Sequence, residues 1–210
     1  MTAALPAETY GSIEFQRETG VSRETMVRLQ IYADLLVKWN RAINLVGPAT
    51  LPDLWRRHML DSAQLLPLLP LRDELTIADL GSGAGFPGLV LTLCGAGHVH
   101  LVESDQKKAT FLRQVLRETG ATADIHCCRI ETLHDLHVDI VTARALAPLP
   151  ALVAHARPLL KSDGLCLFLK GRGVGDELTQ LPKALQDRCD RVPSRSDPAG
   201  CILRLEGPLP

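Results

Sequence analysis

The feature that most constrains the fold is a glycine-rich loop between two apolar runs, in TIADLGSGAGFPGLVLTL at 76–93. Four glycines fall within eight residues, at Gly81, Gly83, Gly85 and Gly88. Because glycine has no Cβ, such a loop lets the backbone approach a ligand closely. One or two glycines would serve a tight turn, whereas four, with an acid at the end of the next apolar run, indicate a ligand-binding loop.

From residue 71 onward, short β-rich segments alternate with helical ones. This alternation is typical of an α/β fold, here Rossmann-like, with a mostly parallel sheet covered by helices on both faces. The expected strands are TIADL, HVHLVE, ADIHCC, VDIVTA, LCLFLK and CILRLE, and the expected helices lie near 88–94, 105–120, 149–160 and 177–185. The stretch DRVPSRSDPAG carries no specific signal.

Residues 1–70 have a different, helical periodicity. Apolar residues recur at helical spacing over 22–43, with Ser22 as the expected N-cap, and Trp39 belongs to this apolar stripe. A second helix is expected from about Pro52 to Leu66, capped by Thr50 and followed by Pro67. The sequence therefore predicts an N-terminal helical extension over 1–70 and a ligand-binding domain over 71–210.

Composition excludes several classes of protein. The chain is 46% hydrophobic with a net charge of −1, so it is globular and any nucleic-acid contact must come from local basic patches. No apolar run reaches the ~20 residues that span a bilayer, and the first 20 residues lack a signal-peptide pattern. The six cysteines form no CxxC pair and no spaced Cys/His ligand set, so we expect no metal and a reducing cytoplasm. No extra interface element is evident, so a monomer is expected.

Three elements around the loop fit a nucleotide-like ligand at the carboxyl ends of the strands. Asp79 precedes the loop by two residues, Gly83 and its neighbours form the loop, and Glu103 ends the second β-rich run. A carboxylate at the position of Glu103 can accept two hydrogen bonds from ribose hydroxyls. Taken literally, the loop also matches the GxGxxG pattern of dinucleotide binding, so NAD has to be considered.

The residues inside the loop favour S-adenosyl-L-methionine over NAD. A dinucleotide places its pyrophosphate on free N–H groups at a helix N-terminus. Pro87 has no N–H and Phe86 adds bulk beside it, which makes a poor phosphate cradle but a good apolar wall. S-adenosylmethionine has no phosphate. Its binding site needs a backbone that approaches it closely, a carboxylate that accepts hydrogen bonds from the ribose, and an apolar slot for the adenine. NAD or FAD, and a non-catalytic nucleotide site, stay as alternatives.

The next two strands offer further candidates. Arg129, Ile130 and Glu131 follow the third β-rich run, where the loop is expected beside the adenine, although Ile130 could equally belong to the core. Arg144 follows the fourth run directly into the ligand crevice. An arginine at such a buried place needs an acceptor partner, so we expect it to contact the substrate.

Five motifs, occurring together and in order, carry a resemblance to a known family. They are KWNRAINLVG (38–47), RRHMLDSAQLL (56–66), ADLGSGAGFPGLVL (78–91), TARALAPL (142–149) and FLKGRG (168–173). The chain resembles the RsmG (GidB) family over about 25–175. Ala143 departs from the pattern, since many members have Ser there; we expect a lost hydrogen bond and retained activity.

The resemblance implies a class I methyltransferase fold and transfer of a methyl group from S-adenosylmethionine to N7 of one guanine in 16S rRNA. It implies that Glu103 holds the ribose and that the cofactor contacts Gly81, Phe86, Ile130, Glu131 and Arg144. The substrate would be 16S rRNA or the small ribosomal subunit, an assembly intermediate included, and the sequence does not choose between them.

Guanine N7 carries no proton, so the transfer requires no general base, and the residues that matter are those that would hold the guanine. The candidates are Asn40, Asn44, His58, Arg144 and Lys170, with Arg172 beside Lys170 for phosphates. Asn44 could instead cap a helix, and His58 could be a structural histidine bridging the helical region and the sheet. An NAD-dependent oxidoreductase and a non-enzymatic RNA-binding scaffold remain as rival classes.

Two basic sets are expected to differ in role. The first, in the extension, is interpreted as an RNA contact and consists of Lys38, Arg41, Arg56 and Arg57. The second, on the helix after Glu103, is interpreted as a solvated face and consists of Lys107, Lys108, Arg113 and Arg117.

Overall fold

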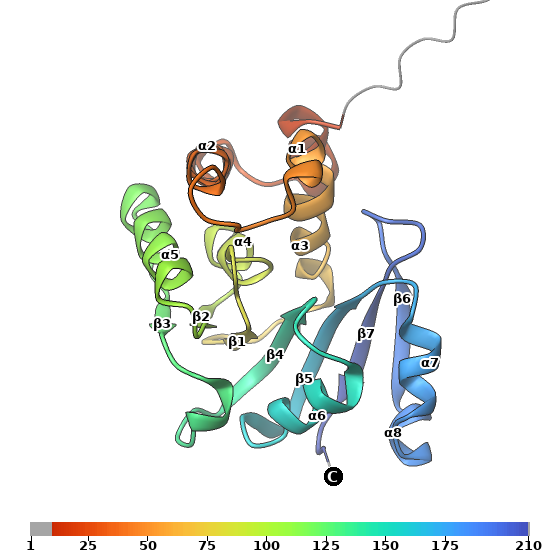
Figure 1. Ribbon diagram of the computed structural model, residues 1–210. Helices are drawn as coiled ribbons and strands as arrows, with labels where there is room; N and C mark the ends of the chain where they lie inside the picture. Colours follow the sequence, from red (N-terminus) through yellow and green to blue (C-terminus); the bar gives the residue numbers. More distant parts are fainter. Residues whose placement is uncertain (1–9, 210) are drawn as a thin grey trace, which may run out of the picture.

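A seven-stranded sheet forms the centre of the molecule in the computed structural model, which describes residues 10–209. The first nine residues, on which the absence of a signal peptide partly rests, lie outside the described residues, as does residue 210. The strand order is β3-β2-β1-β4-β5-β7-β6, and Figure 1 shows β3 and β6 at opposite edges. The strands are β1 (Thr76–Leu80), β2 (His98–Val102), β3 (Asp124–His126), β4 (Val138–Arg144), β5 (Leu160–Lys170), β6 (Cys189–Pro193) and β7 (Cys201–Glu206).

The pairing confirms the predicted mostly parallel sheet. Strands β3, β2, β1, β4 and β5 pair in parallel, and β7 runs antiparallel between β5 and β6. This order reverses between β1 and β4, which places a crevice at the carboxyl ends of these two strands. Strand β6 was missed by the sequence analysis. It pairs on one side only, and its charged, proline-ended sequence CDRVP lacks the apolar alternation that marks a strand.

The helices agree with the predictions except in three places, the first of which is a helix over 12–19 that the sequence analysis missed. They are α1 (Ser12–Thr19), α2 (Arg23–Asn40), α3 (Asp61–Ala63), α4 (Gly88–Leu93), α5 (Gln106–Thr119), α6 (Leu149–Ala156), α7 (Val174–Thr179) and α8 (Lys183–Gln186). Ser22 caps α2 as predicted, since its side chain accepts from the Thr25 N–H. The predicted helix over 177–185 is wrong: α7 and α8 are separate, because Pro182 cannot continue a helix.

The second predicted helix is also wrong in detail. The segment contains 3₁₀ turns at Pro48–Asp53 (η1) and Leu66–Leu68 (η3), with a π-helical stretch at Trp55–Leu60 (η2) leading into α3. Thr50 therefore lies inside η1 and Pro67 inside η3, rather than before and after one α-helix. Two prolines in η1 remove N–H donors that an α-helix would need.

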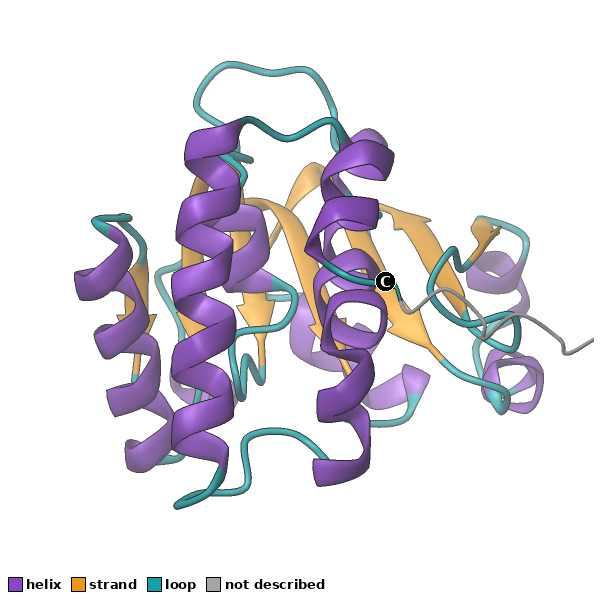
Figure 2. Cartoon of the chain, turned by 90° about the horizontal axis from the view of Figure 1, so that it is seen from above, coloured by secondary structure: helices purple, strands orange, loops and turns teal. Residues whose placement is uncertain are grey.

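Helices cover both faces of the sheet. Figure 1 shows α2, α4 and α5 above it and α6 below it, and Figure 2 shows α2 crossing over the sheet. One cluster of buried side chains joins the N-terminal region to the upper face, and another packs α6 to α8 against the lower face. No helix among residues 10–209 is long and apolar enough to cross a membrane.

One side chain fixes the N-terminal region to the glycine loop. The hydroxyl of Tyr32, fully buried on α2, donates to the Ala84 carbonyl at 2.6 Å. Its ring stacks on Phe86, with the centroids 5.2 Å apart. The predicted extension thus shares a core with the sheet, and the division between residues 70 and 71 stays a prediction.

The fourth glycine of the loop serves packing. Gly88 begins α4, and a Cβ built on it would lie 2.3 Å from Leu101 Cδ2 and 2.7 Å from Asp79 Oδ2. Both atoms are buried and neither can move away cheaply. Only glycine lets α4 approach the sheet this closely.

We therefore expect Gly88→Ala to lower the free energy of unfolding by about 1–3 kcal/mol through overpacking. Gly175→Ala is the matched control, because a Cβ there meets nothing within 4 Å. We expect it to leave the free energy of unfolding unchanged or to raise it by up to about 1 kcal/mol, since Gly175 lies in α7 and alanine favours a helix over glycine. Urea unfolding measures both. Equal effects of the two substitutions would contradict the packing explanation.

Candidate functional site

Two cavities flank the connection from β4 to α6 and share only one lining residue, Ala145. The glycine-loop cavity, of about 400 Å³, is lined by Gly81, Gly83, Val102, Glu103, Ser104, Lys108, Cys128, Arg129, Ile130, Glu131, Ala145, Leu146, Ala147 and His155. The arginine cavity, of about 560 Å³, includes Arg57, His58, Asp61, Arg144, Lys170, Arg172 and Asp197 among its lining residues.

The glycine-loop cavity holds the acid that the sequence singled out. Glu103 directly follows β2, and its carboxylate accepts the Gly83 N–H at 2.8 Å and the Asp105 N–H at 2.7 Å. These two bonds, one on each oxygen, fix the carboxylate at the cavity wall. Each oxygen keeps a further lone pair, so the group can still accept hydrogen bonds from two hydroxyls.

The backbone of the loop approaches the same space. Gly81 and Gly83 have φ of 65° and 56°, which favours glycine. A Cβ on Gly81 would lie 2.5 Å from Leu146 Cδ1, a lining residue that the sequence analysis missed. Leu146 comes from the connection after β4, and only the fold brings it to the loop.

The opposite wall carries the three residues predicted after the third strand. Arg129, Ile130 and Glu131 all line the glycine-loop cavity. Ile130 also packs against the core cluster that contains residues of α6, and its contact with the adenine stays a prediction. Lys108, interpreted as part of a solvated helix face, lines this cavity instead. Ser104, Cys128 and His155 were missed, and no sequence signal marks them.

Three predicted cofactor residues do not line either cavity. Gly85 packs against Leu89, Phe86 is buried with 2% exposure, and Asp79 is fully buried. Asp79 accepts the Gly88 N–H at 3.1 Å on Oδ2 and the Thr142 hydroxyl at 3.0 Å on Oδ1. The side chains of Phe86 and Asp79 are buried in the protein, where they hold the loop in place, and the cofactor contacts of all three residues stay predictions.

Asp79 also bears on the choice between S-adenosylmethionine and NAD. Its carboxylate takes the first N–H of α4, the donor that a pyrophosphate would need. Burial raises the pKa of Asp79 to about 6, so the group still carries a negative charge at neutral pH. The start of α4 therefore offers a phosphate neither a free donor nor a favourable charge.

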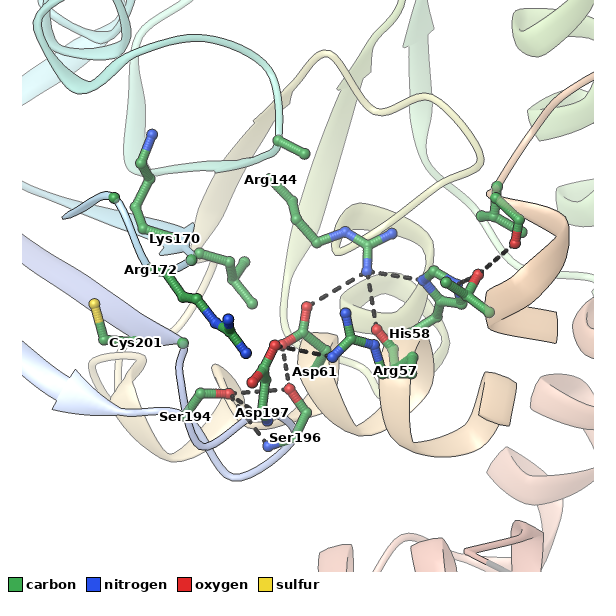
Figure 3. A pocket seen from close by; sticks show the side chains of 18 of the residues that line it. Arg57, His58, Asp61, Arg144, Lys170, Arg172, Ser194, Ser196, Asp197 and Cys201 are labelled. Atoms are coloured by element: carbon green, nitrogen blue, oxygen red, sulfur yellow. Dashed lines mark hydrogen bonds and ion pairs between the residues drawn. The ribbon is translucent and has the colours of Figure 1, made fainter. Parts of the chain in front are cut away.

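Arg144, the last residue of β4, is the centre of the arginine cavity (Figure 3). Its Nη1 donates to His58 Nδ1 at 3.0 Å, to the Arg57 carbonyl at 3.3 Å and to Asp61 Oδ2 at 3.4 Å. The Cζ atom lies 4.8 Å above the centroid of the Phe86 ring, a cation–π distance. The guanidinium is thus held in one orientation before any ligand arrives.

His58 orients this arginine. The Thr50 hydroxyl donates to the Gly47 carbonyl at 2.7 Å, so its oxygen accepts the Nε2–H of His58, also at 2.7 Å. The other ring nitrogen, Nδ1, then accepts from Arg144. Burial, with the charges of Arg144 and Arg57, lowers the pKa of His58 to about 3, so the ring is neutral. The structure favours the interpretation of His58 as a structural histidine.

Lys170 lines the arginine cavity but is already paired. Its Nζ forms an ion pair with Glu177 Oε2 at 2.6 Å and donates to the Ala147 carbonyl at 3.1 Å. Figure 3 shows Lys170 pointing away from Asp61, whereas Arg172 extends toward it. Among these two predicted phosphate contacts, Arg172 is therefore the exposed one.

The two predicted asparagines have different places. Asn44 is exposed, lines neither cavity, and does not cap α2, which ends at Asn40. Asn40 is buried, and its Oδ1 accepts the N–H groups of Leu45 and Val46, both at 2.9 Å. Asn40 therefore shapes the turn that supplies two lining residues of the arginine cavity, instead of facing it.

The connection between β6 and β7 contributes residues that the sequence analysis missed. Asp197 forms an ion pair with Arg57 at 2.9 Å, and the Ser196 hydroxyl donates to Asp61. The hydrogen bond from the Ala199 N–H, with the charges of Arg57 and Arg172, lowers the pKa of Asp197. The polar stretch SRSDPAG gives no sequence signal for this role, because its partners lie more than a hundred residues away.

The chain matches the model of one protein family. The match extends over residues 25–194 and the family is described as GidB, rRNA small subunit methyltransferase G.

Relatives with the name ribosomal RNA small subunit methyltransferase G are similar over nearly their whole length. The protein from Paramagnetospirillum magneticum is 56% identical over 93% of this chain and 95% of its own. The protein from Rhodospirillum centenum is 52% identical over 96% of this chain and 93% of its own.

Solved structures show the same fold at low sequence identity. A class I S-adenosylmethionine-dependent methyltransferase from Listeria monocytogenes has a TM-score of 0.58 at 15% identity, covering 87% of this chain and 68% of that one. The 16S rRNA N2 G1207 methyltransferase of Thermus thermophilus, solved with AdoMet and guanosine, has a TM-score of 0.50 at 19% identity, covering 70% of this chain and 40% of that one. These likenesses confirm the predicted class I methyltransferase fold.

The buried Asp79 predicts a pH-dependent stability. Its pKa in the folded protein, about 6, lies above the ordinary value of 3.8, so the folded state binds more protons than the unfolded state between these values. The free energy of unfolding of the wild type should therefore fall by about 1–3 kcal/mol relative to that of Asp79→Asn as the pH rises from 4 to 7. Urea unfolding of both proteins across this range measures the difference, and a constant difference would contradict the prediction.

Proposed function

Because the chain belongs to the GidB family of rRNA small subunit methyltransferases, we propose that it transfers the methyl group of S-adenosylmethionine to N7 of a guanine in 16S rRNA. One observation carries the proposal for the two sites. The glycine-loop cavity and the arginine cavity meet at Ala145, so a donor in one and a base in the other would lie side by side.

The glycine-loop cavity fits S-adenosylmethionine. Glu103 presents a fixed carboxylate for the ribose, Gly81 and Gly83 present bare backbone, and Ile130 and Leu146 offer apolar surface for the adenine. Its volume of about 400 Å³ lies in the range of small-molecule sites. No phosphate has to be accommodated, which agrees with the charge of Asp79 beside α4.

The chemistry needs positioning rather than proton transfer. S-adenosylmethionine supplies a methyl group on a sulfonium, and guanine N7 has an in-plane lone pair and no proton. The chain therefore has to hold the base in line and exclude other orientations. Such positioning can supply several of the ~7–11 kcal/mol available from an oriented encounter.

Arg144 is the residue best placed to hold the guanine. Within residues 10–209, its hydrogen bonds all use Nη1, and the side chain lines the arginine cavity. Arginine N–H groups suit the O6 acceptor of guanine. Methylation makes the base cationic, and the carboxylates of Asp61 and Asp197 in the same cavity offset that charge. His58 acts through Arg144 as a positioning residue.

The basic residues of the N-terminal region would guide the RNA. Arg57 lines the arginine cavity, while Lys38 and Arg41 are exposed. Arg56 lies 4.9 Å from the Tyr10 ring centroid, which orients it at the surface. Arg172 adds a further cation at the rim for phosphate contact. The N-terminal helical region would in this way shape the entrance for the RNA.

We further place the protein in the cytoplasm as a monomer acting on the small subunit or an assembly intermediate. The free cysteines, Cys94, Cys127, Cys128, Cys166, Cys189 and Cys201, fit a reducing compartment.

Ala143 is fully buried within β4 against the lower core, so its methyl group packs well and activity should be retained.

The test of the whole proposal is methylation of 16S rRNA. Small subunits lacking the modification are incubated with the protein and S-adenosylmethionine, and the RNA is then cleaved at 7-methylguanosine with borohydride and aniline. One protein-dependent strand break supports the proposal. Binding of NAD without S-adenosylmethionine would favour an oxidoreductase, and RNA binding without transfer would favour a scaffold.

Substitution of Arg144 tests whether the arginine cavity holds the guanine and the glycine-loop cavity holds the cofactor. We expect Arg144→Ala to lower methyl transfer by about 10²-fold or more, because the base loses its orientation. Affinity for S-adenosylmethionine should stay near the wild-type value, since Arg144 lines only the arginine cavity. Arg144→Lys should show most of the loss, because lysine lacks the planar fork. An equal loss of cofactor affinity would assign Arg144 to the cofactor instead.

Substitution of Glu103 tests the ribose assignment. We expect Glu103→Gln to weaken S-adenosylmethionine binding by about tenfold or more, because it loses charged acceptors. Glu118→Gln, on the exposed side of α5, serves as the control and should bind normally. Calorimetric titration measures both. Normal binding by the Glu103 variant would remove this carboxylate from the site.

A further inference from the structure

A cluster of three histidines and one aspartate lies at the β3 edge of the sheet, outside both cavities. His98 and His100 belong to β2, and Asp124 and His126 belong to β3. Residues two apart on a strand share a face, and the register pairs His100 with Asp124 and Val102 with His126. All four side chains therefore emerge on the same face of two neighbouring strands.

The polar atoms of the cluster converge. His98 Nε2 lies 2.9 Å from Asp124 Oδ2, and His100 Nδ1 lies 3.5 Å from the same oxygen. The ligand atoms of these three residues all lie within 4.8 Å of one another. His126 Nε2 lies 3.1 Å from His100 Nδ1, which adds a fourth candidate atom.

These separations resemble those in a tetrahedral metal site. With metal–nitrogen bonds of about 2.1 Å, the ligand atoms of a tetrahedron are about 3.4 Å apart. The His98–Asp124, His100–His126 and His100–Asp124 separations of 2.9, 3.1 and 3.5 Å lie around this value. His126 is not among the three residues whose ligand atoms all lie within 4.8 Å of one another, so its ring has to rotate toward them to complete the arrangement. Imidazole nitrogens with one carboxylate oxygen are ligands that Zn²⁺ accepts, and other late divalent ions compete for imidazole.

We propose that His98, His100, Asp124 and His126 form a binding site for one Zn²⁺ ion. This inference is independent of the proposed methyl transfer, because none of the four residues lines either cavity. It departs from the expectation of no metal, which rested on spacing along the chain. Such spacing does not reveal ligands that come from two different strands.

A metal at this site would hold the edge strand β3 in place, close to the glycine-loop cavity proposed for the cofactor. Strand β3 has only three residues and pairs with β2 alone. Two residues after His126, Cys128 begins the segment 128–131, which lines the glycine-loop cavity. A metal joining β2 to β3 would therefore fix the position of that wall and raise the stability of the edge.

The test is calorimetric titration of the untagged full chain with ZnCl₂ after dialysis against a chelator. We expect one ion per chain and a higher melting temperature with Zn²⁺. His100→Ala and Asp124→Asn should each weaken binding by about tenfold or more. The Asp124 side chain is 56% exposed, so this variant tests the site even if the buried-ring variant folds poorly.

Two controls separate this site from other ligands on the chain. His134→Ala removes an exposed histidine outside the cluster, and the double variant Cys127→Ala/Cys128→Ala removes the nearby thiols; both should bind Zn²⁺ as the wild type does. Co²⁺ should give the visible spectrum of a site without thiolate charge transfer. Absent binding, equal binding by Asp124→Asn, or a thiolate–cobalt band would each overturn the proposal.

Discussion

The buried carboxylate of Asp79 is the interaction on which both cavities depend. It joins β1 to β4 through the Thr142 hydroxyl and to the start of α4 through the Gly88 N–H. The first bond fixes the strand that ends at Arg144, and the second fixes the loop that ends at Gly88. Burying a charge is costly unless it is hydrogen-bonded, and the two bonds offset part of that cost.

The ring of Phe86 is the second feature that holds distant segments together. Tyr32 stacks on it from α2, His58 stacks on it with centroids 5.0 Å apart, and Arg144 lies over it. Three segments far apart in the sequence therefore meet at one aromatic side chain. Phe86 lies too deep for either cavity, and its effect on a ligand would come through the arginine that it supports.

The arrangement around Arg144 suits a reaction that moves no proton to the enzyme. His58 is neutral and uses both ring nitrogens within the protein, so it is poorly placed to act as a base. The acids of the arginine cavity are paired with cations. What remains is a rigidly held guanidinium, whose further N–H donors suit a base that carries hydrogen-bond acceptors.

The sequence by itself determined the α/β class, the glycine loop, Ser22 as a cap and Glu103 at the end of β2, because each depends on local spacing or backbone conformation. Tertiary structure alone decided that Asp79 and Phe86 face inward and that His58 orients Arg144. It also decided that Leu146 and Asp197 reach the cavities and that three histidines and one aspartate lie together on β2 and β3. These features depend on contacts between distant segments. The side chain's direction and its partner are set only when the segments pack, so no pattern along the chain contains them.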